Sequence, residues 1–250
     1  MPRLRFAPIA AAVALPLLLL VAACGNDDHS DDALPPLPSP TPAGLDPARF
    51  VATIDNPYWP MTPGSRWVYR ETDADGAAQR VEVTVTKDTR LILGIAATVV
   101  HDIVLAQDGA VIEDTHDWYA QDRDGNVWYL GEDTKEYEDG EVVSTEGSWE
   151  AGVDGAIPGI VMLATPGVDD VYRQEYYAGH AEDAAKVLSL TAGAGVPYGS
   201  FDGVLQTWDF TPLDLNAQEH KHYARGVGLV LVTDPDGTVR EELLAYTPAP

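Results

Sequence analysis

Seven Asp-Gly pairs divide the chain between residues 75 and 237 into short segments. Asp-Gly suits tight hairpin turns, because both central positions of such a turn can take a positive φ. Residues 81–86 alternate strictly between apolar and polar side chains, as a half-buried strand does. The seven pairs are Asp75-Gly76, Asp108-Gly109, Asp124-Gly125, Asp139-Gly140, Asp154-Gly155, Asp202-Gly203 and Asp236-Gly237. The pattern predicts an antiparallel meander and not alternating strands and helices.

Helical signals are sparse in the same region. Residues 182–188 could form two helical turns, but residues 186–190 could equally form a strand. Residues 147–170 are rich in Gly and Pro and predict a long loop or crossover, with a short helix at residues 160–163. We therefore predict that residues 50–250 form one mainly β domain with little helix, built on a curved antiparallel sheet that makes a half-barrel or an open barrel.

Two stretches resemble a group of known proteins. The run Trp-Pro-Met-Thr-Pro-Gly-Ser-Arg-Trp-Val-Tyr at residues 59–69 is similar to the opening of many uncharacterised secreted bacterial β-proteins. Residues 196–205, followed by residues 223–230, resemble the closing hairpins of the same proteins. The resemblance covers roughly residues 57–246 and rests mostly on turn chemistry. It implies a curved sheet like the half-barrel carriers of the bacterial envelope, and it implies no known reaction.

The N-terminus has the pattern of an export signal. Arg3 and Arg5 precede an apolar run at residues 6–23, which ends in small residues before Cys24. A membrane-spanning helix needs about 20 apolar residues, and this run is shorter and contains two prolines. Residues 21–24, Val-Ala-Ala-Cys, resemble the lipobox of bacterial lipoproteins. An ordinary signal peptide or an N-terminal membrane helix is the alternative.

The lipobox resemblance implies a lipid anchor. In that family the cysteine sulfur carries diacylglycerol and the chain is cut just before it. Residues 1–23 would then be a signal peptide, and Cys24 would hold the protein on a bacterial membrane, outside the cytoplasm. Cys24 is the only cysteine, so stability has to come from burial and not from disulfides.

Charge limits the partners of the mature chain. Removing residues 1–23 takes away Arg3 and Arg5 and changes the formal net charge from −25 to −27. This charge opposes contact with nucleic acid or with anionic lipid. Residues 24–49 are rich in aspartate and proline and predict a disordered, semi-extended tether. We expect a monomer whose only membrane contact is the lipid.

Residues 117–132 hold the densest cluster of aromatic side chains. An aromatic face rimmed by acids could grip a sugar or a cationic ligand, although one such face is often core and the other packs across strands. A one-sided sheet buries only one face, so we expect at least one of these aromatics to face a ligand. The candidate ligand-binding residues are Trp118, Tyr119, Trp128 and Tyr129.

The turn decides which of these rings share a face. A two-residue turn at Asp124-Gly125 would place Tyr119 with Trp128 and Trp118 with Tyr129. A longer turn would change the pairing.

Two patterns raise the question of metal binding. The sequence D-x-D-G occurs at residues 73–76, 122–125 and 234–237, but strands and not EF-hand helices are predicted beside it. His220 and His222 lie two residues apart and would need a third ligand. His101 and His116 are options for that ligand, yet a solvated strand edge is the preferred interpretation. We predict no metal and no cofactor.

Catalytic motifs are missing from the sequence. Ser200 lacks the second glycine of a nucleophile elbow, and no phosphate-binding glycine loop or Rossmann pattern occurs. We therefore predict no catalytic residue and a lipid-anchored envelope protein that binds a small or apolar ligand, or a protein partner, on a concave face. A hydrolase acting on envelope polysaccharide and a purely structural envelope component are the alternatives.

Overall fold

A computed structural model describes residues 34–40 and 44–250 of the chain. The described part contains one short 3-10 helix, η1 (Pro47–Arg49), and eighteen strands. The predicted signal peptide, Cys24 and much of the predicted tether lie outside the described residues. Among the helices of the described part, none is long and apolar enough to cross a membrane.

The strands vary in length from two to fifteen residues. In chain order they are β1 (Phe50–Val51), β2 (Ile54–Asn56), β3 (Trp59–Met61), β4 (Arg66–Thr72), β5 (Ala78–Ile92), β6 (Ile95–Leu105), β7 (Val111–Asp122), β8 (Val127–Glu138), β9 (Glu141–Ser144), β10 (Trp149–Glu150), β11 (Ile157–Met162), β12 (Val171–Arg173), β13 (Glu175–Tyr176), β14 (Ala184–Val196), β15 (Gly199–Thr211), β16 (Asp214–Ala224), β17 (Gly228–Thr233) and β18 (Arg240–Thr247).

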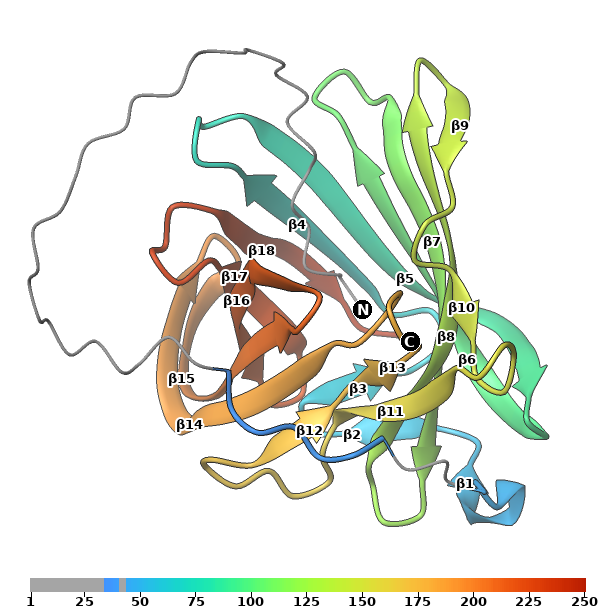
Figure 1. The fold of residues 1–250 in the computed structure, drawn as a ribbon. Helices are drawn as coiled ribbons and strands as arrows, with labels where there is room; N and C mark the ends of the chain where they lie inside the picture. The colour runs from blue at the N-terminus through green and yellow to red at the C-terminus, as the bar shows by residue number, and fades with distance from the viewer. Residues whose placement is uncertain (1–33, 41–43) are drawn as a thin grey trace, which may run out of the picture.

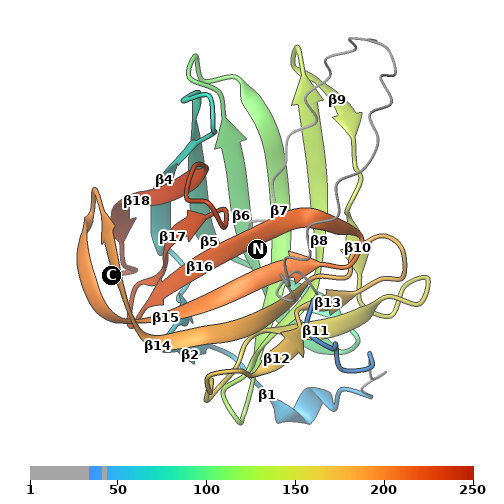
Figure 2. The same ribbon diagram turned by 60° about the vertical axis from the view of Figure 1, so that its left-hand side comes forward.

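One large sheet contains sixteen of these strands, and Figure 1 shows how it curves. Its path runs β12-β14-β15-β16-β17-β18-β4-β5-β6-β7-β8-β11-β13, with β1, β9 and β10 attached to β7 or β8. Neighbouring strands are antiparallel, so the predicted curved antiparallel sheet is confirmed. Figure 2 shows β14, β15 and β16 crossing in front of the upright strands β6 to β8, so the sheet forms two facing walls.

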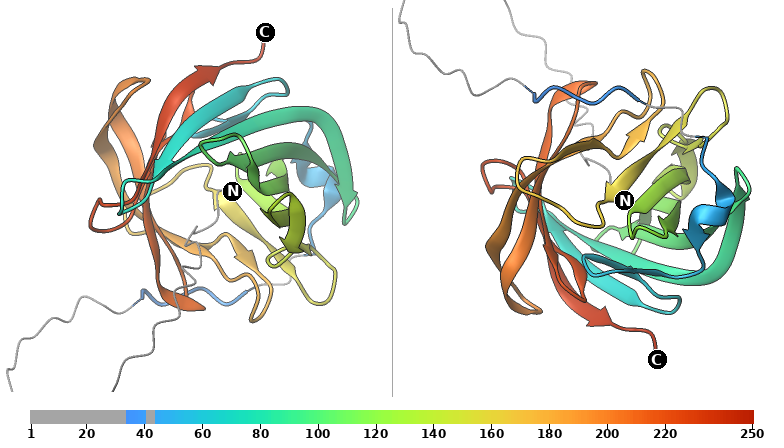
Figure 3. Two further views of the ribbon diagram at one scale, coloured as in Figure 1. Left: turned by 90° about the horizontal axis from the view of Figure 1, so that it is seen from above. Right: turned by 90° about the horizontal axis from the view of Figure 1, so that it is seen from below.

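The two ends of the sheet path meet in one short segment of chain. Strand β12 pairs with β14 at one end, β13 pairs with β11 at the other, and only Gln174 separates β12 from β13. Gly159 of β11 packs directly on this segment, because a Cβ there would lie 2.3 Å from the Gln174 carbonyl carbon. The sheet therefore nearly closes into a barrel, as the end views in Figure 3 show.

The Asp-Gly pairs predict most of the turns. Five of them connect strands that pair with each other: β4–β5, β6–β7, β7–β8, β8–β9 and β17–β18. Asp154-Gly155 lies between β10 and β11, which both pair with β8. Asp202-Gly203 is not a turn and lies within β15, near an irregular part of the β14–β15 register.

The predicted short helix at residues 160–163 is wrong. Residues 157–162 form strand β11 because the edge of β8 is available there, and Ile160 pairs with Trp128. The predicted loop at residues 147–170 accordingly contains both β10 and β11. The ambiguous helix at residues 182–188 resolves as strand β14, whose Ala185 and Val187 are fully buried.

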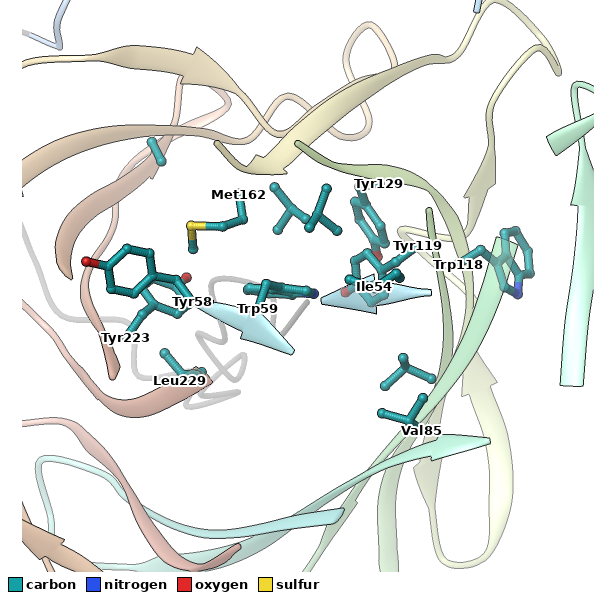
Figure 4. Close-up of a cluster of buried hydrophobic side chains, with 14 of the residues drawn as sticks. Ile54, Tyr58, Trp59, Val85, Trp118, Tyr119, Tyr129, Met162, Tyr223 and Leu229 are labelled. Carbon is teal, nitrogen blue, oxygen red and sulfur yellow. The ribbon is translucent and has the colours of Figure 1, made fainter. Parts of the chain in front are cut away.

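The hairpin β2–β3 lies inside the curved sheet and fills its core. Figure 4 shows Trp59 near the centre of this core, between Tyr119 on one side and Tyr223 on the other. The Trp59 ring centroid is 5.5 Å from that of Tyr119 and 5.8 Å from that of Tyr223. Because Tyr119 is on β7 and Tyr223 is on β16, this one indole connects the two walls of the sheet.

Part of the predicted tether contacts the domain. The Arg173 side chain donates a hydrogen bond from Nε to the Pro38 carbonyl oxygen at 2.9 Å. Pro38, Ser39 and Pro40 line a groove together with Trp128. Contact with the domain therefore begins before Phe50.

Candidate ligand cavity inside the sheet

The inner faces of β4 to β7 bring together side chains that are far apart in sequence. Because side chains alternate along a strand, residues in register across neighbouring strands share a face. Trp67 pairs with Val83, Val83 with Asp102, and Val100 with Asp117. These residues all point into the barrel, toward the β2–β3 hairpin.

A mostly apolar cavity remains between this wall, the hairpin and β17. The empty space among its lining atoms amounts to about 460 Å³, part of which is open solvent at the mouth. The enclosed part of the cavity is narrow, with room for only a few water-sized molecules. Its lining consists of Trp59, Met61, Trp67, Tyr69, Val83, Val100, Asp102, Asp117, Tyr119, Gly228 and Leu229.

Two hydrogen-bond donors in this lining have no partner among the described residues. They are the Trp59 indole nitrogen Nε1 and the Tyr119 hydroxyl. Trp59 is 3% exposed and Tyr119 is 1% exposed, so bulk water does not reach them. Figure 4 shows the nitrogen-bearing end of the Trp59 ring directed toward Tyr119. A buried donor without a partner costs about 1–3 kcal/mol, so an acceptor inside the cavity would be strongly favoured.

The neighbouring aromatic residues show that this is not a general property of the core. The Trp67 indole donates to the Val227 carbonyl oxygen at 2.7 Å, and the Tyr69 hydroxyl donates to the Leu229 carbonyl oxygen at 3.0 Å. The fold therefore satisfies two of the four polar aromatic groups of the cavity with backbone carbonyls. The other two groups, on Trp59 and Tyr119, have no such carbonyl partner among the described residues.

Two buried carboxyl groups lie on the same wall of the cavity. Asp102 is on β6 and Asp117 is on β7, and both are almost completely buried. The Tyr129 hydroxyl donates to Oδ1 of Asp117 at 2.7 Å. Burial raises the pKa of Tyr129 well above its usual value, and the negative charge of Asp117 raises it further. The cavity therefore has a negative wall that suits an amine or a hydroxyl.

The arrangement combines three kinds of recognition. Aromatic rings and aliphatic side chains offer apolar contact, Trp59 and Tyr119 offer donors, and Asp102 and Asp117 offer acceptors. Ligand pockets in proteins are typically apolar with a few placed polar groups, as here. The lining thus offers the contacts that a small amphipathic molecule would need, and aromatic rings beside carboxylates favour a positive charge.

The register of the aromatic hairpin differs from the register that a two-residue turn would produce. The turn spans Asp122 to Asn126, and Ala120 therefore pairs with Trp128 and Tyr119 with Tyr129. Tyr119 and Tyr129 stack on the inner face, with ring centroids 5.0 Å apart. The longer turn therefore applies, and Tyr119 does not share a face with Trp128.

A bulge at Gly131 keeps Glu132 of β8 on the same inward face as Tyr129. Two residues of β8 between Tyr129 and Glu132 lie opposite the single Trp118 of β7. Gly131 has a φ of 128°, and a Cβ there would lie 2.2 Å from the Trp149 carbonyl oxygen, so only glycine fits. As a result Glu132 faces the interior with Asp117.

The four predicted aromatics therefore have different environments. Tyr119 lines the cavity, and Tyr129 lies behind it. Trp118 lies on the other side of β7, as Figure 4 shows, where the Arg90 guanidinium covers its ring at 4.0 Å. Trp128 is half-buried on the outer face, and its indole donates to Asp122 at 2.9 Å. The structure brings together only Tyr119 and Tyr129.

The D-x-D-G carboxylates stabilise turns. Asp73 accepts hydrogen bonds from the backbone nitrogens of Asp75 and Ala77. Asp122 accepts them from Asp124 and Asn126 in the same way. A carboxylate engaged by its own turn is a poor ligand for calcium, in agreement with the hairpin interpretation.

Neither His101 nor His116 joins His220 and His222 as a third metal ligand. His220 and His222 are on β16, and four strands separate β16 from β6 in the sheet. His101 of β6 pairs directly with His116 of β7 instead.

A second cavity is wide, open and acidic. Its lining comes from β8, the β9–β10 connection, β13 and the turn after it, β15 and β16. The residues include Glu136, Glu146, Glu175, His180, Asp183, Thr211 and Asp214. A hydrolase of envelope polysaccharide would need an open cleft with two carboxyl groups, which this region offers. Acidic side chains on their own do not identify a reaction.

Sequence reasoning missed Trp59 and Asp102. Trp59 is in a turn-rich stretch that contains no alternation, so nothing in the pattern indicates that the hairpin folds into the barrel. Asp102 is in strand β6, and its inward direction follows only once the register with β5 and β7 is known.

Comparison with known proteins reveals similarity at the level of structure only. No family model and no curated protein matches the chain. A structure from Bacteroides fragilis, described as an exported protein with a YmcC-like fold, aligns at 15% identity and a TM-score of 0.43, covering 76% of this chain and 99% of its own. A structure from Parabacteroides distasonis, described as a lipoprotein, aligns at 11% identity and a TM-score of 0.39, covering 76% and 98%. Similarities this distant transfer no function or compartment to the chain.

Proposed function

We propose that this protein is a lipid-anchored binding protein of the bacterial cell envelope, which holds a small amphipathic ligand inside its curved sheet. The lipid anchor rests on the lipobox-like residues 21–24. The binding role rests on the cavity of Trp59, Tyr119, Asp102 and Asp117. The observation that carries the proposal is the pair of buried donors, on Trp59 and Tyr119, that have no partner among the described residues.

The ligand has a definable chemistry. Its body is narrow and apolar, because the cavity is narrow and lined by rings and aliphatic side chains. Its head offers an acceptor oxygen to Trp59 and Tyr119, and an amine or hydroxyl to Asp102 and Asp117. An amino alcohol or an amine on an alkyl body meets these requirements, whereas a carboxylate would be repelled by the acidic wall.

A binding role fits this cavity better than polysaccharide hydrolysis. Asp117 and Glu132 lie opposite each other on the inner face of β7 and β8, and each is 1% exposed. A polysaccharide cannot reach carboxyl groups that are this deeply buried. The Tyr129 and Thr134 hydroxyls also donate to these two carboxyl groups, at 2.7 and 3.0 Å.

Short, water-soluble probes test the binding role. Hexylamine, hexanol and hexanoate share one alkyl body, and their binding to the full chain in lipid nanodiscs can be followed by tryptophan fluorescence. We expect hexylamine to bind more tightly than hexanol, and hexanoate to bind least. Native mass spectrometry of the protein from its own membrane would identify the natural ligand.

Matched variants locate the binding site. Trp59→Phe and Tyr119→Phe keep the rings and remove the donors, so hexanol should bind about five- to tenfold more weakly, which corresponds to one lost hydrogen bond. Trp208→Phe is the control, because the Trp208 indole donates to Gln218 and does not line the cavity. If Trp59→Phe and Tyr119→Phe bind hexanol as tightly as Trp208→Phe does, a site at Trp59 and Tyr119 is contradicted.

The anchor has its own test. Cys24→Ala should release the protein from membranes, because the lipid is the predicted attachment. Protein that still sediments with membranes after a carbonate wash would contradict the anchor and leave the cavity proposal unaffected.

A further inference from the structure

Three polar side chains converge on the outer face of β6 and β7. The ring nitrogen Nε2 of His101 lies 3.1 Å from Oδ1 of Asp114, and Nδ1 of His116 lies 3.4 Å from the same oxygen. The two imidazole rings stack with their centroids 4.6 Å apart and their planes 17° apart. One ligand atom from each residue therefore lies within 4.8 Å of the other two.

These separations fit the ligand shell of a small divalent ion. A tetrahedral zinc ion with bonds of about 2.0–2.1 Å holds its ligand atoms about 3.3 Å apart. The two separations from Oδ1 of Asp114, 3.1 and 3.4 Å, lie on either side of this value. Two imidazoles and one carboxylate are a common donor set for zinc in proteins, with the fourth position open to water or substrate.

The backbone holds the three donors in place. His101 and His116 are directly opposite each other in the β6–β7 register, and Asp114 is two residues before His116 on the same face. All three are on central strands of the sheet, so little conformational entropy is lost when an ion binds. The side chains are 33%, 28% and 40% exposed in the order His101, Asp114 and His116, which leaves the site open to solvent.

Charged or titratable neighbours surround His116 on its own strand and on both adjacent strands. Burial lowers the pKa of His116, and the neighbouring His101 lowers it further. The adjacent strand β8 places Asp133 directly opposite His116, and Lys135 forms an ion pair with Asp133 at 2.9 Å.

We propose that His101, Asp114 and His116 bind a zinc ion on the outer face of the sheet. This site goes beyond the proposed ligand cavity, because His101 and His116 point outward while Asp102 and Asp117, the next residues along the same strands, point inward. It also replaces the sequence-based pair His220 and His222, whose missing third ligand is not supplied by His101 or His116.

Isothermal titration of the full chain in detergent with zinc chloride tests the proposal. We expect one strong zinc equivalent that requires all three residues, and a loss of at least about tenfold in affinity for His101→Ala, His116→Ala and Asp114→Asn. Cobalt(II) serves as a spectroscopic probe, because a visible absorption band that depends on His101 and His116 reports direct coordination. Circular dichroism of each variant checks that the fold is kept.

A matched control is available in the same chain. His180→Ala removes an exposed histidine that stacks on Tyr177 and should leave zinc affinity unchanged. If the His101→Ala/His116→Ala double variant binds zinc as tightly as the unmodified protein, the ion is bound elsewhere and the proposal is wrong. If the unmodified protein binds no zinc, the three side chains are only a hydrogen-bonded surface cluster. Neither result affects the hexanol experiment on Trp59 and Tyr119.

Discussion

The inner and outer faces of strands β6 and β7 carry opposite kinds of chemistry within the same few residues. Asp102 and Asp117 point into a closed, aromatic cavity, and His101 and His116 point out to solvent. The two-residue period of a strand produces this separation, because neighbouring residues face opposite sides. Inside, burial makes each polar group costly unless it is paired, whereas outside, polar groups can gather at little cost and stay accessible.

The largest expected effect is a difference between the two faces in their contribution to the free energy of unfolding. Tyr119→Ala removes a ring that is 1% exposed and should lower the free energy of unfolding by about 3–5 kcal/mol. His116→Ala, on the outer face of the same strand, should change it by less than about 0.5 kcal/mol. Urea unfolding of both variants checks the difference. Similar losses would show that the outer face is as important for folding as the inner face.

Side chains on the outer face are buried to different extents, and two tryptophans test this difference. Trp118 is 4% exposed beneath the Arg90 guanidinium, whereas Trp128 is half-buried. Trp118→Ala should therefore cost about 3 kcal/mol, and Trp128→Ala about half of that. Thermal melts of the two variants measure the difference. Equal costs would mean that Trp128 is buried more completely than the structure shows.

The two faces should also differ in their response to pH. Zinc binding requires neutral imidazoles, so its affinity should fall by about tenfold per pH unit for each histidine that becomes protonated. The pKa of His116 is lowered, so its protonation begins below the usual histidine range as the pH falls. None of the described residues that line the inner cavity is a histidine, so hexanol binding should lack this step. Titrations between pH 5 and pH 8 check both expectations.

The Tyr129 hydroxyl allows the two faces to be compared through the loss of one hydrogen-bonding group. Tyr129→Phe removes the donor to Asp117 and should cost about 1 kcal/mol, because the buried carboxyl loses a hydrogen bond. Asp114→Asn, which also changes one hydrogen-bonding group, should cost less because water reaches the outer face. Chemical denaturation of both variants in the absence of zinc is the measurement, and a larger loss for Asp114→Asn would reverse the expected order.

The smallest expected effect concerns Lys135. Its ammonium pairs with Asp133, which is opposite His116, and its positive charge also lowers the pKa of His116. Lys135→Ala should raise zinc affinity about two- to fivefold, because a nearby positive charge is removed and Asp133 becomes available. Titration with zinc measures the change. An unchanged or lower affinity would exclude a role for Asp133 and leave the three-residue site to be judged by its own variants.

Turn chemistry made much of the fold predictable. The Asp-Gly pairs indicated the hairpins because this dipeptide tolerates positive φ, and alternation indicated strands such as β5. One such turn also determines which residues of β6 and β7 pair, and so where the outer histidines lie. Pairing outward from a two-residue turn at Asp108-Gly109 leads to His101 opposite His116, which is the register observed. The sequence pattern of a turn does not by itself show that two opposite histidines also share a face with Asp114.

The sequence alone determined the mainly β architecture and the positions of most turns, because both depend on local backbone preferences and on side-chain alternation. Only the tertiary structure decided what lies inside. The β2–β3 hairpin has no pattern that directs Trp59 into the barrel, and the bulge at Gly131 shifts the β8 register by one residue. The closure through Gln174 likewise depends on chain segments that meet only in the folded sheet. Cavities arise from such long-range contacts, because local patterns carry no information about which distant strands will face each other.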